Sequence, residues 1–372
     1  MEADELAAWV RLLAAPGIGR ESARKLLACY GSPQAVLAAS IASRAQVVGP
    51  APAQALAKSS EETDALVVST LAWLAGADAD DETSPRAVVT LGDPLYPAAL
   101  LQTADPPLLL YAQGRTELLA ASSLAVVGSR NPTPQGSENA RAFARHLSDA
   151  GLAVVSGLAL GIDAAAHEGA LQGSGGTIAV VGTGLDRVYP KRHFDLAHRI
   201  AREGLVLSEY PLGTPPLAGH FPTRNRVIAG LTRGTLVVEA ALQSGSLITA
   251  RLASEAGRDV FAIPGSIHSP LSRGCHALIK QGAKLVETAN DILDELHWGA
   301  PRLPDAEAAG GAEPSGDDPL LEALGHDPVG LEALVARTGW SAAALNIRLL
   351  EMELAGSVAR LPGQLFQRLA QG

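Results

Sequence analysis

Short aliphatic runs alternate with helix-like segments through the middle of this 372-residue chain, and this alternation most restricts its fold. Six runs have the length and the β-branched or aliphatic character of buried strands: 124–128, 152–156, 177–182, 205–208, 235–238 and 260–263. Continuous apolar strands of this kind are typical of parallel sheets covered on both faces. Helical segments lie between or after them: 135–149, 163–172, 194–202, 246–257 and 275–281. We therefore predict an α/β domain over residues 86–297, with an extended Rossmann-like, doubly wound and mostly parallel sheet.

The N-terminal flank has a different pattern. Residues 1–77 place apolar side chains at helical spacing around the glycine turn Pro16-Gly17-Ile18-Gly19, which predicts a helical domain of the sterile-alpha-motif (SAM) or helix-hairpin-helix type. The amides of such a turn either approach a DNA phosphate or leave the hairpin only packed against neighbouring helices. The sequence leaves both open.

The C-terminal flank predicts two further parts. Residues 298–317 are rich in small residues, proline and acidic residues, as in a flexible linker. Residues 318–372 then show two helical patterns and two strand-like runs around Pro362-Gly363, which predicts a winged-helix-like domain.

Composition excludes several classes of protein. Apolar residues make up 47% and charged residues 18%, which is unlike a disordered chain. Residues 1–10 contain three acids and no base, unlike a secretory leader, and the uncharged apolar run 65–77 is too short to span a bilayer. Cys29 and Cys275 are too few and too far apart for a disulfide framework or a zinc cluster. We expect a cytoplasmic protein with no membrane contact, metal or cofactor.

The formal net charge of −10 at first argues against a polyanionic partner. The charge is uneven along the chain: residues 1–120 carry 8 bases and 14 acids, residues 121–297 carry 16 and 15, and residues 298–372 carry 5 and 10. The predicted sheet domain is therefore at +1 between acidic flanks of −6 and −5, and it holds eight of the nine histidines. Its local field is compatible with nucleic acid.

Small or polar residues follow five of the predicted strands, at 128–130, 156–161, 182–184, 208–211 and 239–246. Because ligands of open α/β sheets bind beyond the carboxyl ends of the strands, these loops are expected to meet at one edge. Their backbone amides, together with Arg130 and Lys191, predict an anion pocket. A single strand-end glycine can equally serve only to turn the chain.

The loops of this predicted pocket do not match the two commonest nucleotide-binding motifs. The first loop reads GSRNPTPQG, and the Gly182-Thr183-Gly184 loop lacks the third glycine of a dinucleotide fingerprint. The chain also has no G-x-x-x-x-G-K-[ST] segment. Nicotinamide chemistry and P-loop hydrolysis are therefore disfavoured.

Residues 220–230, HFPTRNRVIAG, are the most informative segment. We predict a loop up to the arginines, with Pro222 ending the preceding structure and the apolar residues after it starting a short helix. Guanidinium groups suit bidentate phosphate contacts, and Asn225 can reach a sugar, a base or a carbonyl. The alternative is that Arg224 and Arg226 are salt-bridged to Glu209 or Glu239 and only hold the loop.

Aromatic residues lie close in sequence to these bases, which favours stacking on unpaired bases. They are Tyr189, Phe194, Tyr210 and Phe221, and core packing is the stronger alternative for the last two. An enzyme would need an acid–base set, and only Asp163 and His167, four apart on one predicted helix, offer one. An aspartate near a helix start more often serves the helix dipole.

Seven segments, in order, resemble the DNA-processing protein A family, DprA or Smf. They are GSR at 128–130, SGLALGIDAAAHEGAL at 156–171, GTGLDRVYP at 182–190, SEYP at 208–211, FPTRNRVIAGL at 221–231, 237–265 and GCHALIKQGA at 274–283. The resemblance covers about residues 86–297. The flanks resemble the family in kind only.

This resemblance implies a non-catalytic recombination mediator. Such a protein binds and protects incoming single-stranded DNA in competence and natural transformation, loads RecA onto it, and dimerises through its Rossmann-like domain. By motif, Arg130, Lys191, Arg224 and Asn225 would contact DNA, with Arg226 in the same motif and Ser156 and Gly157 offering close approach to phosphate. His193 stands where many members have Asn, which adds a titratable group.

Two alternatives come from other classes. A phosphoribohydrolase-like enzyme on a related scaffold would carry a P-G-G-x-G-T motif, but residues 239–246 read EAALQSGS. A transcription regulator led by the winged helix is weakened by the net charge of the tail, with Arg348 almost alone on the expected recognition helix. A partner-binding or regulatory role suits that tail better.

Overall fold

The structure is a computed structural model that describes residues 2–76, 84–298, 319–324, 329–354, 358–361 and 365–368. The chain divides into two compact units, residues 1–300 and 301–372. Within the described ranges, no helix is long and apolar enough to cross a membrane. The predicted domain and linker boundaries remain predictions, because residues 77–83 and 299–318 lie outside the described ranges.

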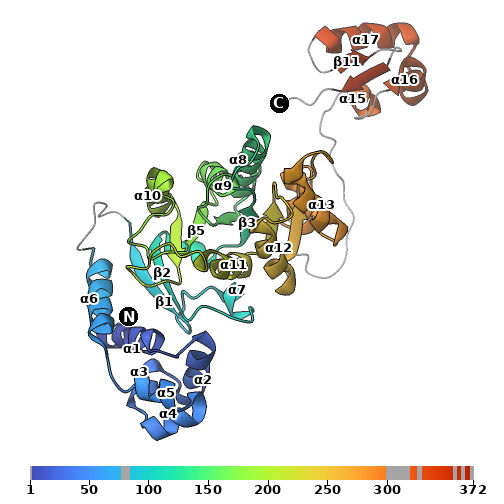
Figure 1. Ribbon diagram of the computed structural model, residues 1–372. Helices are drawn as coiled ribbons and strands as arrows, with labels where there is room; N and C mark the ends of the chain where they lie inside the picture. Colours follow the sequence, from blue (N-terminus) through green and yellow to red (C-terminus); the bar gives the residue numbers. More distant parts are fainter. Residues whose placement is uncertain are drawn as a thin grey trace, which may run out of the picture. The chain divides into compact units, whose positions relative to one another are not determined.

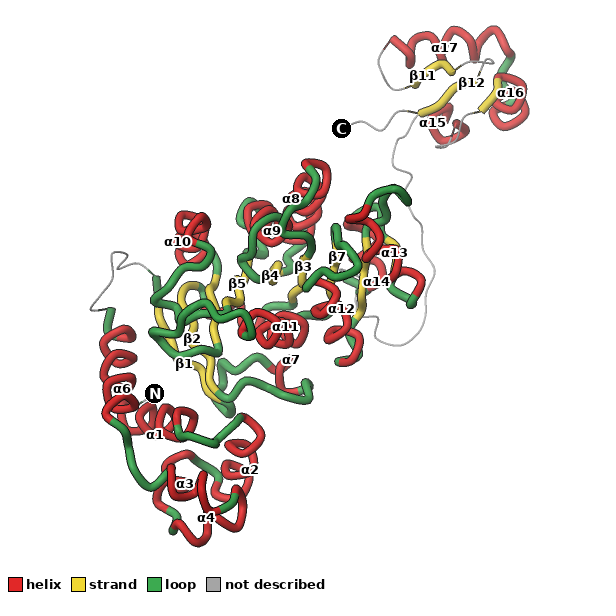
Figure 2. The backbone as a smooth tube through the Cα atoms, viewed as in Figure 1, coloured by secondary structure: helices red, strands yellow, loops and turns green. Residues whose placement is uncertain are grey.

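A nine-stranded sheet organises the first unit, in the order β1-β2-β6-β5-β4-β3-β7-β8-β9. Figure 2 shows β5, β4, β3 and β7 in this succession. Its pairs are parallel from β6 to β9, whereas β1 and β2 are antiparallel additions at one edge. The strands are β1 (Arg86–Thr90), β2 (Leu109–Gly114), β3 (Ser123–Val127), β4 (Ala153–Ser156), β5 (Thr177–Val181), β6 (Leu205–Ser208), β7 (Gly234–Val237), β8 (Asp259–Ala262) and β9 (Lys284–Leu285). The mostly parallel α/β fold is confirmed, with all six predicted strands and three more.

Helices cover both faces of the sheet, as Figure 1 shows. One face packs against α8 (Pro134–Asp149), α9 (Ile162–Ala170), α10 (Phe194–Glu203) and α14 (Ala289–Glu295). The other packs against α7 (Ala98–Leu101), α11 (His220–Leu231), α12 (Ser246–Glu255) and α13 (Arg273–Lys280). Strands buried on both faces explain why their sequences are continuously apolar.

The segment around Pro222 is a helix, and the prediction of a loop up to the arginines was wrong. Helix α11 begins at His220, so Pro222 lies in its first turn. The first N–H groups of a helix have no carbonyl partner within it, so a proline there removes no hydrogen bond. Arg224, Asn225 and Arg226 are therefore held on a rigid helix that is packed on the sheet.

Among described residues 2–76, six helices precede the sheet: α1 (Ala3–Ala14), α2 (Arg20–Tyr30), α3 (Pro33–Ala38), α4 (Ile41–Val48), α5 (Pro50–Ala55) and α6 (Glu61–Leu74). The glycine turn between α1 and α2 is packed inward, because Ile18 is buried in the same apolar cluster as Leu108 and Leu109 at the start of β2. Gly17 has a φ of +79°, which favours glycine there. The structure thus shows the hairpin packed against the rest of the unit.

The second unit is small and has its own apolar core. It contains α15 (Pro319–Leu324), α16 (Leu331–Thr338) and α17 (Ala342–Leu354), with β10 (Val329–Gly330), β11 (Val358–Leu361) and β12 (Leu365–Arg368) in the antiparallel order β10-β12-β11. The predicted winged-helix-like arrangement is confirmed, although Pro362 and Gly363 lie outside the described residues.

Candidate nucleic-acid interface

An open cavity of about 610 Å³ lies at the carboxyl ends of the parallel strands, where β3 and β7 are neighbours. The chain leaves β3 toward β4 on one side and reaches β7 on the other, so this is the switch point where ligands of such sheets bind. The loop after β3, the helix α11 and the start of α12 all line the cavity. The predicted meeting of strand-end loops is therefore present.

Arg130 extends from the loop after β3 at the exposed rim of this cavity. Its guanidinium carbon lies 6.0 Å from the centre of the Phe221 ring, and no described acidic group lies within ion-pair distance. Glu239 fixes the loop instead of pairing with an arginine: its carboxylate accepts from the Thr133 amide at 2.9 Å and hydroxyl at 2.6 Å. The cation is thus presented to solvent by a braced loop.

Arg224 forms part of the cavity wall, with only 5% of its surface exposed. One guanidinium nitrogen donates to the Val180 carbonyl, and the buried Nε has no hydrogen-bond partner among the described residues. Burial lowers the pKa of Arg224 to about 10, partly opposed by the Asp163 carboxylate and Tyr210. The side chain is therefore still a cation at neutral pH, in a site where its charge is poorly compensated.

Gly157 makes the space that this guanidinium occupies. A Cβ at Gly157 would lie 2.5 Å from both terminal nitrogens of Arg224. Ser156, by contrast, points its hydroxyl into the sheet and donates to the Val126 carbonyl at 2.7 Å. Of this predicted pair, Gly157 shapes the site and Ser156 holds neighbouring strands.

Asp163 and His167 have separate structural partners. The Asp163 carboxylate accepts from the amides of Gly157 and Ala159 at 3.1 and 3.2 Å, which fixes the loop after β4. His167 is fully buried and its Nδ1 bonds the Thr177 hydroxyl at 2.7 Å. Burial lowers the pKa of His167 to about 3, so its imidazole is neutral. These contacts match roles in supporting the cavity.

The N-terminus of α12 closes one side of the cavity with the small residues Ser244, Gly245 and Ser246. Asn225 also lines it, and its amide nitrogen lies 3.4 Å from the Gly245 carbonyl. The first amides of this helix are used within the turn: Ser246 N–H donates to the Ser244 hydroxyl, and the amides of Leu247 and Ile248 donate to the carbonyls of Ser244 and Gly245. The run 244–246 lies within 239–246, one of the strand-end segments that the sequence predicts to meet at one edge of the sheet.

The segment from Tyr189 to Phe194 leads away from the cavity. Tyr189 lines it, is 47% exposed and lies 5.4 Å from Phe221 between ring centres. Lys191 is exposed and does not line the cavity, while Phe194 at the start of α10 is 55% exposed. His193 is buried, with Nδ1 bonded to the Leu158 carbonyl at 2.9 Å, and so fixes this segment.

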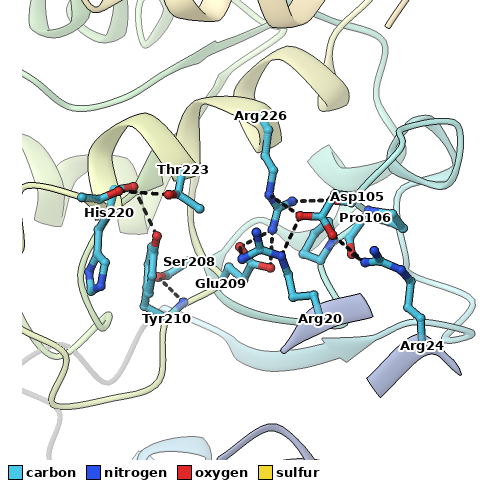
Figure 3. A network of polar contacts seen from close by, with 12 residues as sticks. Arg20, Arg24, Asp105, Pro106, Ser208, Glu209, Tyr210, His220, Thr223 and Arg226 are labelled. Atoms are coloured by element: carbon cyan, nitrogen blue, oxygen red, sulfur yellow. Dashed lines mark hydrogen bonds and ion pairs between the residues drawn. The ribbon is translucent and has the colours of Figure 1, made fainter. Parts of the chain in front are cut away.

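Arg226 points away from the cavity, and Figure 3 shows where it goes. One of its terminal nitrogens lies 2.5 Å from both carboxylate oxygens of Glu209, and the other donates to the Asp105 carbonyl at 2.7 Å. The ion pair with Glu209, considered as the alternative for this residue, is the arrangement that the structure shows. Tyr210 and His220 stack beside it, with ring centres 4.1 Å apart.

Comparison with known proteins identifies relatives across both units. The model of the family described as DNA recombination-mediator protein A matches residues 87–297, and the DprA winged helix domain matches residues 304–364. Protein Smf of Escherichia coli is 43% identical over 304 residues, which cover 80% of this chain and 79% of that protein. The DNA processing protein DprA of Streptococcus pneumoniae is 52% identical over 206 residues, or 55% of this chain and 73% of that one.

Two solved structures resemble the fold. The X-ray structure of DprA from Streptococcus pneumoniae aligns with a TM-score of 0.67 at 41% identity, covering 78% of this chain and 97% of that one. A structure of DprA from Helicobacter pylori, described as giving insight into its single-stranded DNA binding mode, aligns with a TM-score of 0.53 at 33% identity. That match covers 57% of this chain and 95% of the other.

Proposed function

The chain belongs to the DNA recombination-mediator protein A family, and from that premise we propose that it binds single-stranded DNA in the cavity at the carboxyl edge of its sheet. Its role in DNA processing and recombination follows from the family. The proposed finer role is to protect incoming DNA during natural transformation and to load a RecA recombinase onto it. In this role the protein acts in the cytoplasm as a homodimer joined through the Rossmann-like domain, without catalysis.

The observation that carries this proposal is that one open site combines Arg130, which has no ion pair with a described residue, the weakly compensated Arg224 and the half-exposed ring of Tyr189. Arg130 and Arg224 provide positive charge for a backbone phosphate. Tyr189 provides a partly exposed ring on which an unpaired base can stack. A paired base cannot stack in this way, so the site favours a single strand.

The proposed contact residues are Arg130, Arg224, Asn225 and Tyr189 inside the cavity, with Lys191 and Phe194 continuing the track outside it. Gly157, Asp163 and His193 support these contacts, because their described bonds hold the surrounding loops. Arg226 is excluded from the proposed contacts, since its guanidinium is engaged by Glu209 and Asp105. Ser156 is excluded for the same kind of reason.

Fluorescence anisotropy with matched single- and double-stranded oligonucleotides, titrated across salt, tests this function. We expect preference for the single strand and a fall of affinity with salt, since each neutralised phosphate releases about 0.7 counterion. Arg130→Ala is expected to weaken binding about tenfold, and Lys191→Ala substantially, because charge-assisted contacts are lost. Arg145→Ala, which removes a charge from the exposed side of α8, is the matched control. Equal binding of both forms, or equal effects of Arg130→Ala and its control, would contradict the site.

The alternative function is a nucleotide-processing enzyme on a related Rossmann-like scaffold, and the cavity's position at the switch point is the observation that favours it. Incubating the purified protein with nucleoside monophosphates and measuring release of free base separates the two. Turnover abolished by Arg224→Ala would support the enzyme. No turnover together with tight binding of the single strand supports the mediator.

A further inference from the structure

Helix α11 has two functional sides that are one residue apart. Asn225 lines the cavity, and Arg226 points into the polar network of Figure 3. Successive residues of an α-helix are about 100° apart around the axis, so neighbouring side chains readily serve different surroundings. Any force on Arg226 therefore acts on the same rigid element that presents Arg224 and Asn225 to the cavity.

Two carboxylates hold the Arg226 side chain. Glu209, directly after β6, lies 2.5 Å from the guanidinium. Asp105, in the segment between α7 and β2, accepts through its carbonyl at 2.7 Å, and its carboxylate lies 3.3 Å from the Arg226 Nε. These contacts come from two different segments and restrict the helix in more than one direction.

The same Asp105 carboxylate also holds the N-terminal helices. Arg20 Nε donates to it at 2.7 Å and Arg24 Nη1 at 2.6 Å, both from α2. Arg20 further lies 3.8 Å from Glu209. Helix α2 is thereby linked to α11 through one shared acid, although the two helices are about 200 residues apart in sequence.

Charge and burial make this network sensitive to the loss of one member. Three guanidinium groups surround two carboxylates, and the side chains of Arg226 and Glu209 are only 15% and 13% exposed. Burial alone would raise the pKa of Asp105, but its contacts with Arg24, Arg226 and Arg20 hold the pKa below its usual value. Removing one partner of a partly buried cluster leaves the remaining like charges poorly compensated.

The N-terminal helices are themselves firmly seated beside this network. Ile18, between α1 and α2, is buried against Leu108 and Leu109, and Trp73 of α6 packs on Tyr111 of β2 with ring centres 6.0 Å apart. Because α2 is anchored by this apolar contact, its arginines have a fixed position relative to Asp105. The network therefore joins two anchored elements instead of tethering a mobile one.

We propose that Arg20, Arg24, Asp105, Glu209 and Arg226 form a positioning network through which the N-terminal helices set the orientation of α11 and with it the affinity for single-stranded DNA. None of these five residues needs to touch the strand. The inference rests on the proposed function for its DNA readout, and its structural part is measurable without DNA.

Asp105→Asn tests the network because simple electrostatics and positioning predict opposite signs. Losing an acid reduces repulsion of a polyanion and should tighten binding. Positioning predicts weaker binding of a labelled oligothymidylate in the full-length chain, by about fivefold, at the low end of coupling between sites. Glu21→Gln is the matched control, since it removes one acid from α2 where the partner is Lys25 at the exposed surface.

A double-mutant cycle asks whether α2 acts through Arg226. Arg24→Gln alone is expected to weaken binding about threefold, and to have no further effect in an Arg226→Gln background, since coupled residues are not additive. Lys25→Ala removes the same charge from the same helix outside the network and should leave affinity nearly unchanged. Should Asp105→Asn fail to fold, this cycle decides the question, because Arg24→Gln leaves Asp105 paired with Arg20 and Arg226.

Amide hydrogen exchange of the peptide spanning 220–231, measured without DNA, supplies a readout of α11 itself. Faster exchange there in Asp105→Asn, but not in Glu21→Gln, is expected because local opening is easier. The proposal is overturned if wild type binds the strand while Asp105→Asn binds equally or more tightly, or if exchange in 220–231 is unchanged. Absence of binding by wild type would instead overturn the proposed function.

Discussion

The two sides of α11 carry arginines in opposite electrostatic settings. On the cavity side, Asp163 is the main charge opposing Arg224, and the nearby Arg130 has no ion pair with a described residue. On the network side, Arg226 shares two carboxylates with two other arginines. Arginines of one short motif thus have different roles. A weakly compensated cation at an open site can bind an anion, whereas a paired cation connects parts of the fold.

Arg224→Ala is expected to break the cavity side most severely. The loss of a poorly compensated cation from the cavity wall should weaken single-strand binding about 10- to 100-fold, the range for charge-assisted hydrogen bonds. Anisotropy measures this, and circular dichroism melting checks that the protein remains folded. Arg224→Lys should recover part of the affinity by restoring the charge. Unchanged affinity in Arg224→Ala would remove this residue from the proposed contacts.

His167, which supports the cavity, and Asp105, which belongs to the network, should lose their contributions to stability at different pH values. The folded-state pKa of His167 is about 3 against about 6.5 unfolded, so between these values the unfolded state binds the extra proton. Stability is therefore full above pH 6.5 and falls as pH drops, by up to about 1.4 kcal/mol per pH unit. Asp105, whose pKa is lowered, supports the network down to its usual range and loses this support only in stronger acid.

Urea unfolding at pH 7.0 and 5.5 in wild type and His167→Gln measures the first of these responses. The wild type should lose about 1.3 kcal/mol between the two pH values from this group, and the variant should show a smaller difference. The same pH dependence in both proteins would mean that His167 is protonated in the folded state.

Gly157→Ala sharpens the comparison without changing any charge. The added methyl group would collide with the Arg224 guanidinium and move it, so we expect about fivefold weaker single-strand binding. Gly219→Ala is the control, because a Cβ there meets nothing within 4 Å. Gly157→Ala should leave amide hydrogen exchange at residues 20–30 unchanged, because it does not disturb the contacts of Arg226 with Asp105 and Glu209. Wild-type affinity in Gly157→Ala would show that the position of Arg224 is not critical.

The smallest effect on single-strand affinity is expected for a substitution in the second unit. Arg348→Ala in α17 should change single-strand affinity by less than about twofold, because this residue pairs with Glu351 in an acidic unit. The same anisotropy titration checks it. A loss comparable to that of Arg224→Ala would require the winged-helix-like unit to contribute directly to binding.

Much of the sheet was predictable because buried parallel strands have a simple apolar signature. Strands β1, β2 and β9 escaped prediction. β1 and β9 are the two edge strands, and β9 has only two residues, both exposed. β2 is an interior antiparallel strand that is buried along most of its length, so its apolar run at 108–112 carries the same signature and was missed. Helix α11 was misread at Pro222, since a proline signals a helix start as readily as an end. Local pattern alone does not choose between these.

The position of the site could be predicted, but which arginines face the cavity and which pair with acids could not. The strand-end rule brought the loops to one edge, including Arg130, Arg224 and Asn225. That Arg226 would meet Asp105, 121 residues earlier, depends on the antiparallel β2 and on the docking of α2. Side-chain direction at this range follows from tertiary packing, which spacing in the sequence does not encode.

The apolar face shared by β2 and the N-terminal helices has a consequence for shortened forms of the chain. Leu108, Leu109 and Tyr111 are at most 4% exposed, and their cover comes from residues such as Leu6, Trp9 and Ile18. Removal of the first 76 residues would expose these side chains as a contiguous hydrophobic surface close to the β1 edge of the sheet. Exposed hydrophobic surfaces of this kind promote self-association. The sheet therefore depends on the N-terminal helices to keep this face out of water. A shortened protein would need other residues to cover the face if it is to stay monomeric.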